Sequence, residues 1–307
     1  MKGWLVNDCL TCIPGTRTFW HDLLDWIPDL ENMCDEYSDY STLAYKIENR
    51  ASLLGAPDYI IRNATYFRRM HILTKTISLL QDASGNLDNQ LDVCNNSDVV
   101  VFNSPHTANL YRPYIKVRTE IIPIGTNFDL FKPTPERKAE LKSKYNIQSP
   151  CVLYVGDSSE HPKGFPTVLQ LIEQTNYNFC LVMKDDFSLN HPRVRVFNKI
   201  PQEMLTEIAN CCDVIICTSH METLHLAGIE AAACGLPVVA TNVGIYPSIA
   251  ESGWGHLVTT VPEFISAIES VLSHKENYDS RGAFLEAGLD KDVCKKRWQD
   301  LIVSLER

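Results

Sequence analysis

Two glutamates eight positions apart, Glu222 and Glu230, stand in an almost wholly apolar part of the chain. A helix is predicted to begin between them, near Leu226. The first turn of a helix offers unpaired backbone N–H groups that can bind a diphosphate. A carboxylate such as that of Glu230 is costly to bury unless hydrogen bonds are donated to it, and a ribose diol could donate them. Glu222, on the preceding loop, would face the sugar end. These residues therefore fit a nucleotide-sugar site.

The segments on either side of these glutamates predict the strands and the helix that position them. A β-branched run, VIICTS (214–219), precedes the pair, and LPVVAT (236–241) follows it. The order strand, loop, helix, turn, strand predicts a βαβ unit in a parallel sheet. Ligands of such sheets bind beyond the carboxyl ends of the strands, which is where we expect Glu222.

The spacing alone is weak evidence, because a solvated helix residue and a loop charge give the same pattern. The whole string from Glu222 to Val239 is more specific. It resembles the retaining GT-B glycosyltransferases of family 4, which have an E-x7-E motif followed by a turn of the Cys-Gly-Leu-Pro-Val-Val type. The resemblance implies an α/β fold of the GT-B class, with two Rossmann-like βαβ domains facing across a cleft.

Further segments carry the same resemblance. VLYVGDSSEHPKGF (152–165) is similar to the first strand and loop of the family's nucleotide-binding domain, and IIPIGTNFDLFKP (121–133) to the segment joining its two domains. LQDASG (80–85) and DVVVFNSPHTANLY (98–111) are similar to later strands of the acceptor domain.

Short apolar runs alternate with helical patterns along the chain, and a Pro- and Gly-containing segment around 125–146 reads as a linker. We expect an acceptor-side domain over 1–130, short for the family, a nucleotide-sugar-binding domain over 131–290, and a C-terminal helix over 291–307 that crosses back to the first domain. The candidate strands are 3–7, 77–81, 99–103, 120–124, 152–156, 178–183, 194–198, 214–219, 238–241 and 256–259.

A lysine ammonium can reach the space above the second sheet, because Lys163 follows an expected strand by way of a loop. An exposed loop lysine is the alternative, and the resemblance favours phosphate binding. Family members usually carry arginine after the strand glycine, whereas this chain has Asp157, so His161, another basic residue or a different phosphate geometry must compensate. The resemblance implies catalytic roles for Lys163 and Glu222, and donor binding by Gly156, Lys163, Gly164, Ser219, Leu224, His225, Leu226 and Glu230.

A second departure is Leu224-His225, where the family commonly has Phe-Gly. The backbone N–H groups there can still bind the donor. The imidazole of His225 adds a side chain beside the diphosphate, and it is a candidate second hydrogen-bond donor to it.

The first domain offers weaker signals. Gly15 and Thr16 lie between the first expected strand and a helix, and they resemble the glycine loop that GT-B enzymes place near the donor phosphates; a plain structural turn is the alternative. Asp82 ends a strand where some family members carry a histidine that contacts the donor sugar. It is a third catalytic candidate.

A basic run extends from Arg62 to Lys75 and includes Arg68 and Arg69. A solvated face is one interpretation. The other is a positive patch on the acceptor side, so Arg62, Arg68 and Arg69 are acceptor-side candidates for a phosphate, an anionic glycan or nucleic acid. Modified DNA is the least favoured acceptor, because the net charge of the chain is −10.

The composition bounds the class of protein. The 307 residues, 45% of them hydrophobic, are enough for two cores, and no run approaches a transmembrane segment. The N-terminus does not read as a secretory signal, and the odd number of cysteines, 11, favours free thiols in a cytoplasmic location. Cys9 and Cys12 have the spacing of a zinc or redox pair, but no second pair completes a site. Cys211 and Cys212 are expected in the core.

The expected reaction is transfer of a sugar from a nucleotide diphosphate sugar to an acceptor hydroxyl, with retention implied by the resemblance. It requires no protein nucleophile, metal or cofactor, because the departing diphosphate can take the acceptor's proton while Lys163 stabilises its charge. Two alternatives stay open: a nucleotide-sugar epimerase on the same fold, and a non-catalytic nucleotide-sugar-binding protein.

Overall fold

The computed structural model describes residues 1–6, 14–33, 40–64, 72–81, 87–250 and 252–306. The chain divides into two compact units. Unit 1 consists of Met1–Gly125 together with Asp292–Arg307, and unit 2 consists of Thr126–Lys291. None of the helices in the described ranges combines the length and the apolar character that a membrane span requires.

Unit 1 is built on a six-stranded sheet in the order β2-β1-β3-β4-β5-β6, and every strand pair in it is parallel. Its strands are β1 (Gly3–Val6), β2 (Leu30–Asn32), β3 (Tyr59–Asn63), β4 (Lys75–Leu80), β5 (Val99–Phe102) and β6 (Arg118–Ile121). Its helices are α1 (Pro14–Trp26), α2 (Tyr40–Leu54), α3 (Leu87–Asn95), α4 (Pro105–Tyr111), the 3-10 turn η1 (Arg112–Tyr114) and α11 (Lys291–Ser304).

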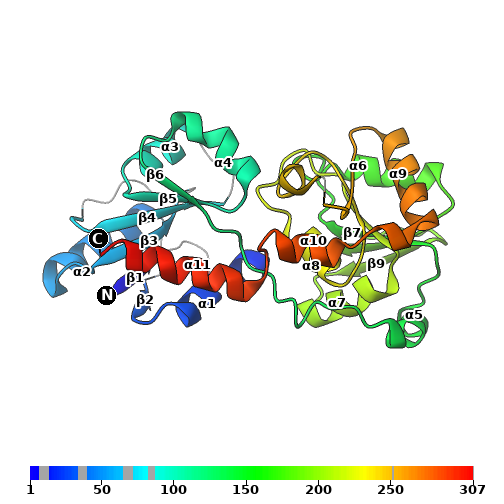
Figure 1. Cartoon of the computed structure of the whole chain (residues 1–307), viewed down its shortest axis with the longest axis horizontal. Coiled ribbons are helices and arrows are strands. Elements are labelled where there is room, and N and C mark those ends of the chain that lie inside the picture. Colours follow the sequence, from blue (N-terminus) through cyan, green and yellow to red (C-terminus); the bar gives the residue numbers. More distant parts are fainter. Residues whose placement is uncertain (7–13, 34–39, 65–71, 82–86, 251, 307) are drawn as a thin grey trace. The chain divides into compact units, whose positions relative to one another are not determined.

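Helix α11 is the last helix of the chain, and it packs within unit 1, where it lies beside α1 (Figure 1). The ring of Trp298 is 6.2 Å from that of Phe19, and the side chain of Gln299 donates a hydrogen bond of 2.9 Å to the carbonyl of Trp26. Cys294, Trp298, Leu301 and Ile302 are its buried residues. The apolar face of this helix therefore belongs to the core of unit 1.

Unit 2 repeats the architecture with a parallel sheet in the order β12-β11-β10-β7-β8-β9. Its strands are β7 (Cys151–Gly156), β8 (Asn178–Met183), β9 (Val194–Asn198), β10 (Val214–Cys217), β11 (Val238–Ala240) and β12 (Gly255–Leu257). Its helices are α5 (Lys138–Tyr145), α6 (Phe165–Gln174), α7 (Gln202–Cys211), α8 (Leu226–Ala233), α9 (Val261–Ser273), α10 (Ser280–Glu286) and the 3-10 turns η2 (Pro135–Arg137), η3 (Tyr246–Ile249) and η4 (Lys275–Asn277).

Helices cover both faces of the second sheet, with α6 and α9 on one side and α7 on the other (Figure 1). The core beneath α6 and α9 contains Val152 and Tyr154 of β7 and Val214 and Ile216 of β10. Because side chains alternate along a strand, Cys151 and every second residue after it in β7 face the opposite side of the sheet, which α7 covers. These strands are buried on both faces, so their sequences are continuous apolar runs. The strands could therefore be predicted from the sequence.

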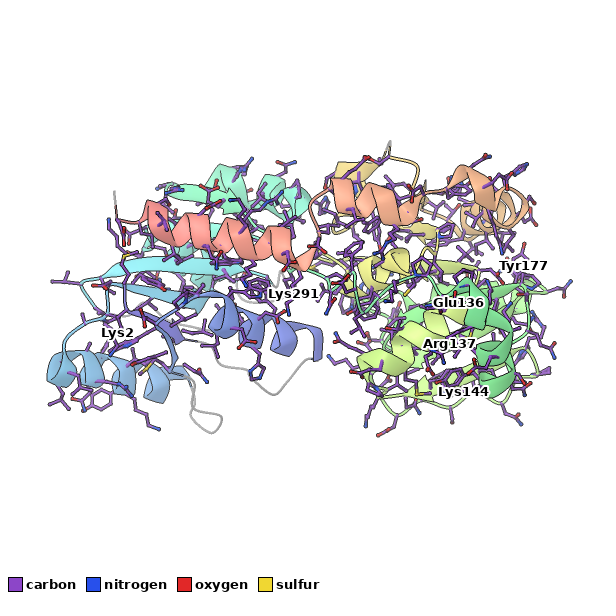
Figure 2. The ribbon with its side chains drawn as sticks, turned by 60° about the horizontal axis from the view of Figure 1, so that its bottom comes forward. Lys2, Glu136, Arg137, Lys144, Tyr177 and Lys291 are labelled. Atoms are coloured by element: carbon purple, nitrogen blue, oxygen red, sulfur yellow. The ribbon has the colours of Figure 1, made fainter. Side chains whose placement is uncertain are left out.

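On the second layer, α5 is fastened to α7 by charged groups. Glu207 of α7 lies 2.5 Å from Lys144 Nζ and 3.5 Å from a nitrogen of Arg137, which directly precedes α5. Figure 2 shows Arg137 and Lys144 on the same side of unit 2. The hydroxyl of Tyr145 also hydrogen-bonds to Glu207. Exposed pairs of this kind contribute little individually, so packing of the helices supplies most of the stability here.

The expected fold class is confirmed in its architecture: two α/β units, each with a parallel sheet. All ten expected strands are present within a few residues, whereas β2 and β3 were not expected. Strand β3 was not predicted because it contains Arg62, and this residue was interpreted as the start of a basic run. Every residue of β3 is buried between β1 and β4.

Candidate functional site

The carboxyl ends of β7 and β10 bring Lys163 and Glu222 together, although they are 59 residues apart. Lys163 Nζ lies 2.6 Å from Glu222 Oε1, and Ser219 donates a hydrogen bond of 2.9 Å to the same oxygen. The side chains are 26% and 14% exposed, respectively, so both charges are within reach of a ligand. Burial opposes the charged form of Lys163, but the Glu222 carboxylate outweighs it and raises the pKa of the lysine. The ammonium therefore keeps its charge at neutral pH.

The loops that carry this pair are tied to one another by hydrogen bonds. Thr218 Oγ1 donates to the Lys163 carbonyl at 2.9 Å, and the His220 N–H donates to the Pro162 carbonyl at 2.7 Å. Gly164 has φ +62°, and a Cβ there would lie 2.1 Å from the carbonyl oxygen of Thr218. Only glycine fits that conformation and that approach. The structure thus gives Gly164 a role in holding the two loops together.

A third loop fixes the position of Glu222. The N–H of Gly244 donates to the Glu222 carbonyl at 3.1 Å, and the N–H of Ile245 donates to the Leu224 carbonyl at 3.3 Å. Gly244 has φ +60°, and a Cβ there would meet the Leu224 carbonyl at 2.7 Å. The segment after β11 is therefore part of the scaffold of the site, which the sequence analysis did not predict; the polar residues and glycine of TNVG (241–244) are the pattern that could have indicated a turn there.

Glu230 lies one turn inside α8 and is 9% exposed. Gln202 donates a hydrogen bond of 3.2 Å to its Oε1. Burial raises the pKa of Glu230 to about 8, and the bond from Gln202 offsets only part of that effect. Without a ligand this carboxyl is therefore mostly protonated at pH 7. The sequence placed Glu230 in an apolar setting, but Gln202, 28 positions away, carried no signal.

Replacing Glu230 with Gln should stabilise the folded chain at neutral pH. Because the pKa is raised above that of the unfolded chain, the stability of the wild type falls as the pH rises from about 4.5 towards 8. We expect Glu230→Gln to increase the free energy of unfolding by up to about 3 kcal/mol at pH 7 and by little at pH 4.5. Urea unfolding at both pH values measures it, with the exposed Glu136→Gln as the matched control. An equal change at both pH values would contradict the raised pKa.

His225 begins α8 in the left-handed region, with φ +69°. Its Nδ1 hydrogen-bonds to the hydroxyl of Tyr246, whose ring stacks on Trp254 at 4.9 Å. Gly228 leaves the room for this pair, since a Cβ there would lie 1.9 Å from the Tyr246 hydroxyl. Burial lowers the pKa of His225 to about 4, so its imidazole is neutral at pH 7. It therefore supplies no second positive charge to a diphosphate.

Asp157 occupies the position at which the family usually has arginine, and its carboxylate accepts a hydrogen bond within its own loop. Its Oδ1 accepts a hydrogen bond of 3.1 Å from the Ser159 N–H, and its carbonyl accepts one of 2.8 Å from the Tyr154 hydroxyl. The same tyrosine explains Gly156, because a Cβ there would lie 2.5 Å from the Tyr154 hydroxyl. The ring of His161 lies 4.8 Å from that of His220, on the loops beside Lys163.

The comparisons with known proteins place this geometry in a family. Residues 149–274 match the family described as glycosyl transferases group 1, and this segment contains Gly156, Lys163, Glu222 and Glu230. The segment belongs to the glycosyl transferases group 1. It spans most of unit 2, in which the GT-B resemblance of the sequence was strongest.

Curated relatives resemble part of the chain, and solved structures share its fold. The probable sucrose-phosphate synthase of Thermosipho melanesiensis is 32% identical over 184 residues, which is 54% of this chain and 42% of the relative. A D-inositol 3-phosphate glycosyltransferase of Mycobacteroides abscessus is 33% identical over 135 residues, which is 43% of this chain and 28% of the relative. The chain thus spans less than half the length of these two curated relatives.

Among solved structures, the sucrose-phosphate synthase of Thermosynechococcus elongatus superimposes with a TM-score of 0.82 at 17% identity, covering 99% of both chains. The Anabaena protein HepE, in complex with UDP-glucose, superimposes with a TM-score of 0.78 at 16% identity, covering 99% of this chain and 100% of that one. At these identities the similarity establishes the fold, which is that of the GT-B glycosyltransferases.

In unit 1, Gly15 and Thr16 lie in the first turn of α1. Asp82, Arg68 and Arg69 are outside the described residues, so their roles stay predictions. Lys75 begins β4 at the amino end of the sheet and pairs with Asp98 at 3.4 Å.

Arg62 requires a correction. It was an acceptor-side candidate, but it is 2% exposed in the middle of the unit 1 sheet and therefore cannot contact an acceptor. Its guanidinium donates hydrogen bonds to Ser78 Oγ at 2.9 Å, the Val93 carbonyl at 3.0 Å and Ser97 Oγ at 3.2 Å. Burial lowers its pKa to about 10, so it stays charged at neutral pH. Its role is structural.

Proposed function

We propose that the chain is a glycosyltransferase that moves a sugar from a nucleotide diphosphate sugar to an acceptor hydroxyl, with retention of the anomeric configuration. The observation that carries the proposal is the 2.6 Å pair of Lys163 and Glu222 at the carboxyl ends of β7 and β10, just before α8 begins. This is the edge of a parallel sheet at which such folds bind nucleotides. The match of residues 149–274 to glycosyl transferases group 1 supports it.

Each residue has a defined task in this proposal. The ammonium of Lys163 and the first N–H groups of α8 bind the diphosphate, which carries its charge next to a positive helix end. Glu222 keeps Lys163 charged and oriented, and it accepts hydroxyl hydrogen bonds at the sugar end. Glu230 accepts hydrogen bonds from the ribose diol. Gly156 and Gly164 hold the backbone of the loops close enough for these contacts.

The chemical step breaks the bond between the anomeric carbon and the diphosphate oxygen and forms a bond from that carbon to the acceptor oxygen. The acceptor's proton passes to the departing diphosphate, so atoms and charge balance without a protein nucleophile. Lys163 lowers the barrier because its charge acts where negative charge grows as the bond breaks. Retention rests on the family resemblance.

The donor class follows from the nucleotide complexes of similar folds. HepE was solved with UDP and with UDP-glucose, and we therefore propose a uridine or related nucleotide sugar as the first donor to test. The proposed acceptor is a compound with a free hydroxyl, such as a glycan or a lipid-linked sugar. With Arg62 buried, an anionic acceptor would depend on Arg68 and Arg69.

The test combines binding with turnover. A thermal-shift panel of nucleotides and nucleotide sugars should give one donor that raises the melting temperature, because a ligand bound only by the folded state stabilises it. With that donor, hydrolysis and transfer to a panel of hydroxyl acceptors are measured separately. Transfer supports the proposal. Release of free nucleotide with an altered sugar and no need for acceptor would indicate an epimerase, and binding without turnover would indicate a non-catalytic protein.

Donor affinity should rise with pH through Glu230. If the ribose donates to an ionised carboxylate, that carboxyl, whose pKa is about 8, must lose its proton on binding. The Kd of UDP-glucose should therefore fall by up to about tenfold per pH unit between pH 6 and pH 8. Its diphosphate does not change charge in this range. Calorimetry in buffers of different ionisation enthalpy should detect the released proton.

The matched variant for this effect is Glu230→Ala. Loss of a charge-assisted hydrogen bond is worth about 1.5–3 kcal/mol, so the Kd at pH 8 should rise by roughly 10- to 100-fold and lose its pH dependence. An unchanged Kd would remove Glu230 from the donor site. If the Kd of the wild type does not change between pH 6 and pH 8, the proposal that the ribose binds to the ionised carboxylate of Glu230 is contradicted.

A further inference from the structure

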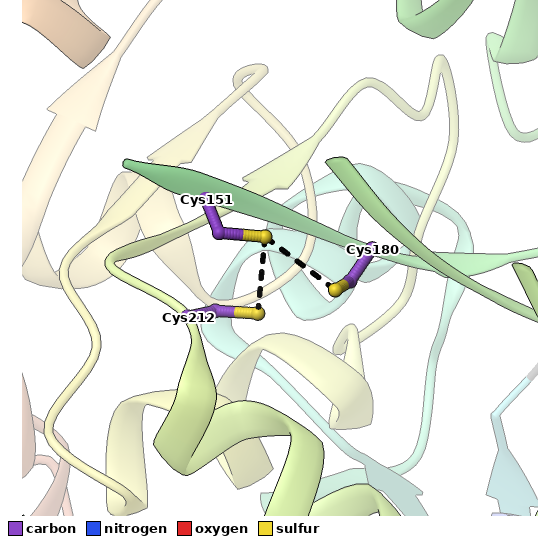
Figure 3. Close-up of side chains that lie close together, drawn as sticks. All are labelled: Cys151, Cys180 and Cys212. Atoms are coloured by element: carbon purple, nitrogen blue, oxygen red, sulfur yellow. Dashed lines mark hydrogen bonds between the residues drawn. The ribbon is translucent and has the colours of Figure 1, made fainter. Parts of the chain in front are cut away.

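Three buried cysteines from separate elements of unit 2 converge on one point (Figure 3). Cys151 is the first residue of β7, Cys180 is the third residue of β8, and Cys212 directly follows α7. Cys151 Sγ lies 3.4 Å from Cys180 Sγ and 3.8 Å from Cys212 Sγ, and all three sulfurs are within 4.8 Å of one another. Their exposed fractions are 0%, 0% and 2%. We call these residues the cysteine triad.

We propose that the cysteine triad binds a single soft metal ion, and that Cu(I) is the ion it suits best. Thiolates select soft ions such as Cu(I) and Zn²⁺ over hard ones. A metal about 2.3 Å from each of three sulfurs requires sulfur separations of about 4 Å, and the observed separations of 3.4 Å, 3.8 Å and at most 4.8 Å are close to that value. Zn²⁺ takes four ligands, whereas among the described residues the group of mutually close ligand atoms consists of these three sulfurs. Cu(I) accepts three.

Charged groups lie next to the triad. Lys138 Nζ donates to the Cys212 carbonyl at 3.2 Å, and both Lys138 and Lys275 pair with the neighbouring Asp213, at 3.1 Å and 2.7 Å. The two lysines neutralise the charge of Asp213, which follows Cys212 in the chain and would otherwise repel metal-bound thiolates. Each thiol that binds the ion releases its proton to solvent, and the oxidation state of Cu(I) does not change.

A small pocket lies next to two residues of the triad. Cys151 and Cys180 line a small pocket of about 20 Å³, together with Ile147, Phe179 and the polar side chains of Asn178 and Arg195. That volume accommodates one water-sized species. The pocket opens at the amino ends of β7 and β8, whereas Lys163 follows the carboxyl end of β7. The metal site is therefore distinct from the proposed donor site.

Packing alone is the simpler interpretation of buried cysteines, and Cys212 was expected to serve that purpose. Cys211 illustrates it: its Sγ bonds to the Glu207 carbonyl at 3.2 Å, one residue from the triad but outside the group of close sulfurs. Packing does not require three thiols from three elements to place their sulfurs together. The positions 151, 180 and 212 have no motif spacing, so only the fold reveals them.

The test titrates the full chain with Cu(I), supplied anaerobically as its bicinchoninate complex, and follows the loss of the chelator's colour. Cys9 and Cys12 are first replaced with Ser, because a C-x-x-C pair would itself take up the ion. We expect one equivalent of Cu(I) per chain. Cys151→Ala, Cys180→Ala and Cys212→Ala should each weaken binding by at least about 100-fold, whereas the matched control Cys211→Ala should keep it.

A second measurement does not depend on the folding of variants. X-ray absorption of the copper-loaded chain with an intact triad should show three sulfur neighbours and no oxygen or nitrogen, and the bound ion should raise the melting temperature. The proposal is overturned if Cu(I) is not taken up. It is also overturned if uptake is the same with and without the triad, if Cys211→Ala loses it equally, or if the absorption spectrum shows fewer than three sulfurs.

Discussion

Replacing Lys163 with Ala should lower kcat/KM for sugar transfer by about 10²–10³-fold. The ammonium lies 2.6 Å from Glu222 and, in the proposed reaction, acts on the diphosphate oxygen that gains charge as the glycosidic bond breaks. An interaction that strengthens in the transition state changes kcat as well as KM. Steady-state rates with the identified donor, measured over a range of donor concentrations, separate the two constants.

Two variants control for this result. Lys199→Ala removes an exposed lysine that pairs with Asp186 at 2.5 Å, and it should leave kcat/KM unchanged. Glu222→Gln retains Lys163 but removes the carboxylate that favours its charged form and orients it, so its effect on kcat should be smaller than that of Lys163→Ala. A rise in KM with an unchanged kcat for Lys163→Ala would show that the lysine binds the donor without acting in the chemical step.

Replacing Asp213 with Ala should destabilise the chain by about 3 kcal/mol at pH 7. The carboxylate is 3% exposed and meets Lys138 and Lys275, while its other oxygen accepts hydrogen bonds from Ser149 at 2.9 Å and from the N–H of Cys151 at 3.0 Å. Its removal leaves buried donors without a partner and two lysines close together. Urea unfolding followed by circular dichroism measures the loss.

The pH dependence of this loss has a definite sign. Burial by itself would raise the pKa of Asp213, but hydrogen bonding and charge from Lys275 and Lys138 lower it well below the ordinary range. Its contribution is therefore present above about pH 4 and declines as the pH falls below that. The difference between Asp213→Ala and the wild type should shrink in acid. Asp186→Ala, which removes an exposed pair, should cost less than about 1 kcal/mol; an equal loss there would contradict the role of burial.

The sequence predicted the elements of the site better than the contacts within it. The runs at 152–156, 214–219 and 236–241 are strands, and the helix expected near Leu226 begins at that residue. Strands buried on both faces read as apolar runs, so their identity is a local property of the chain. The positive φ angles of Gly164 and Gly244, and the carbonyls that approach them, came from the structure.

Contacts between distant residues required the tertiary structure. Arg62 was expected in solvent because arginine is rarely buried, yet it satisfies its donors with residues 16 to 35 positions away. Tyr246, 21 positions after His225, hydrogen-bonds to its ring and holds it in the interior. Neither partner is implied by a spacing along the chain.

What the sequence determined by itself is therefore the kind of fold and the segment that carries the donor chemistry, because periodicity and turn residues act over a few positions. The tertiary structure decided which side chains meet: Lys163 with Glu222, Gln202 with Glu230, and the three sulfurs of the cysteine triad. The strand order β11-β10-β7-β8 brings their elements together. That order follows from packing of the whole sheet, and no single segment of the chain contains it.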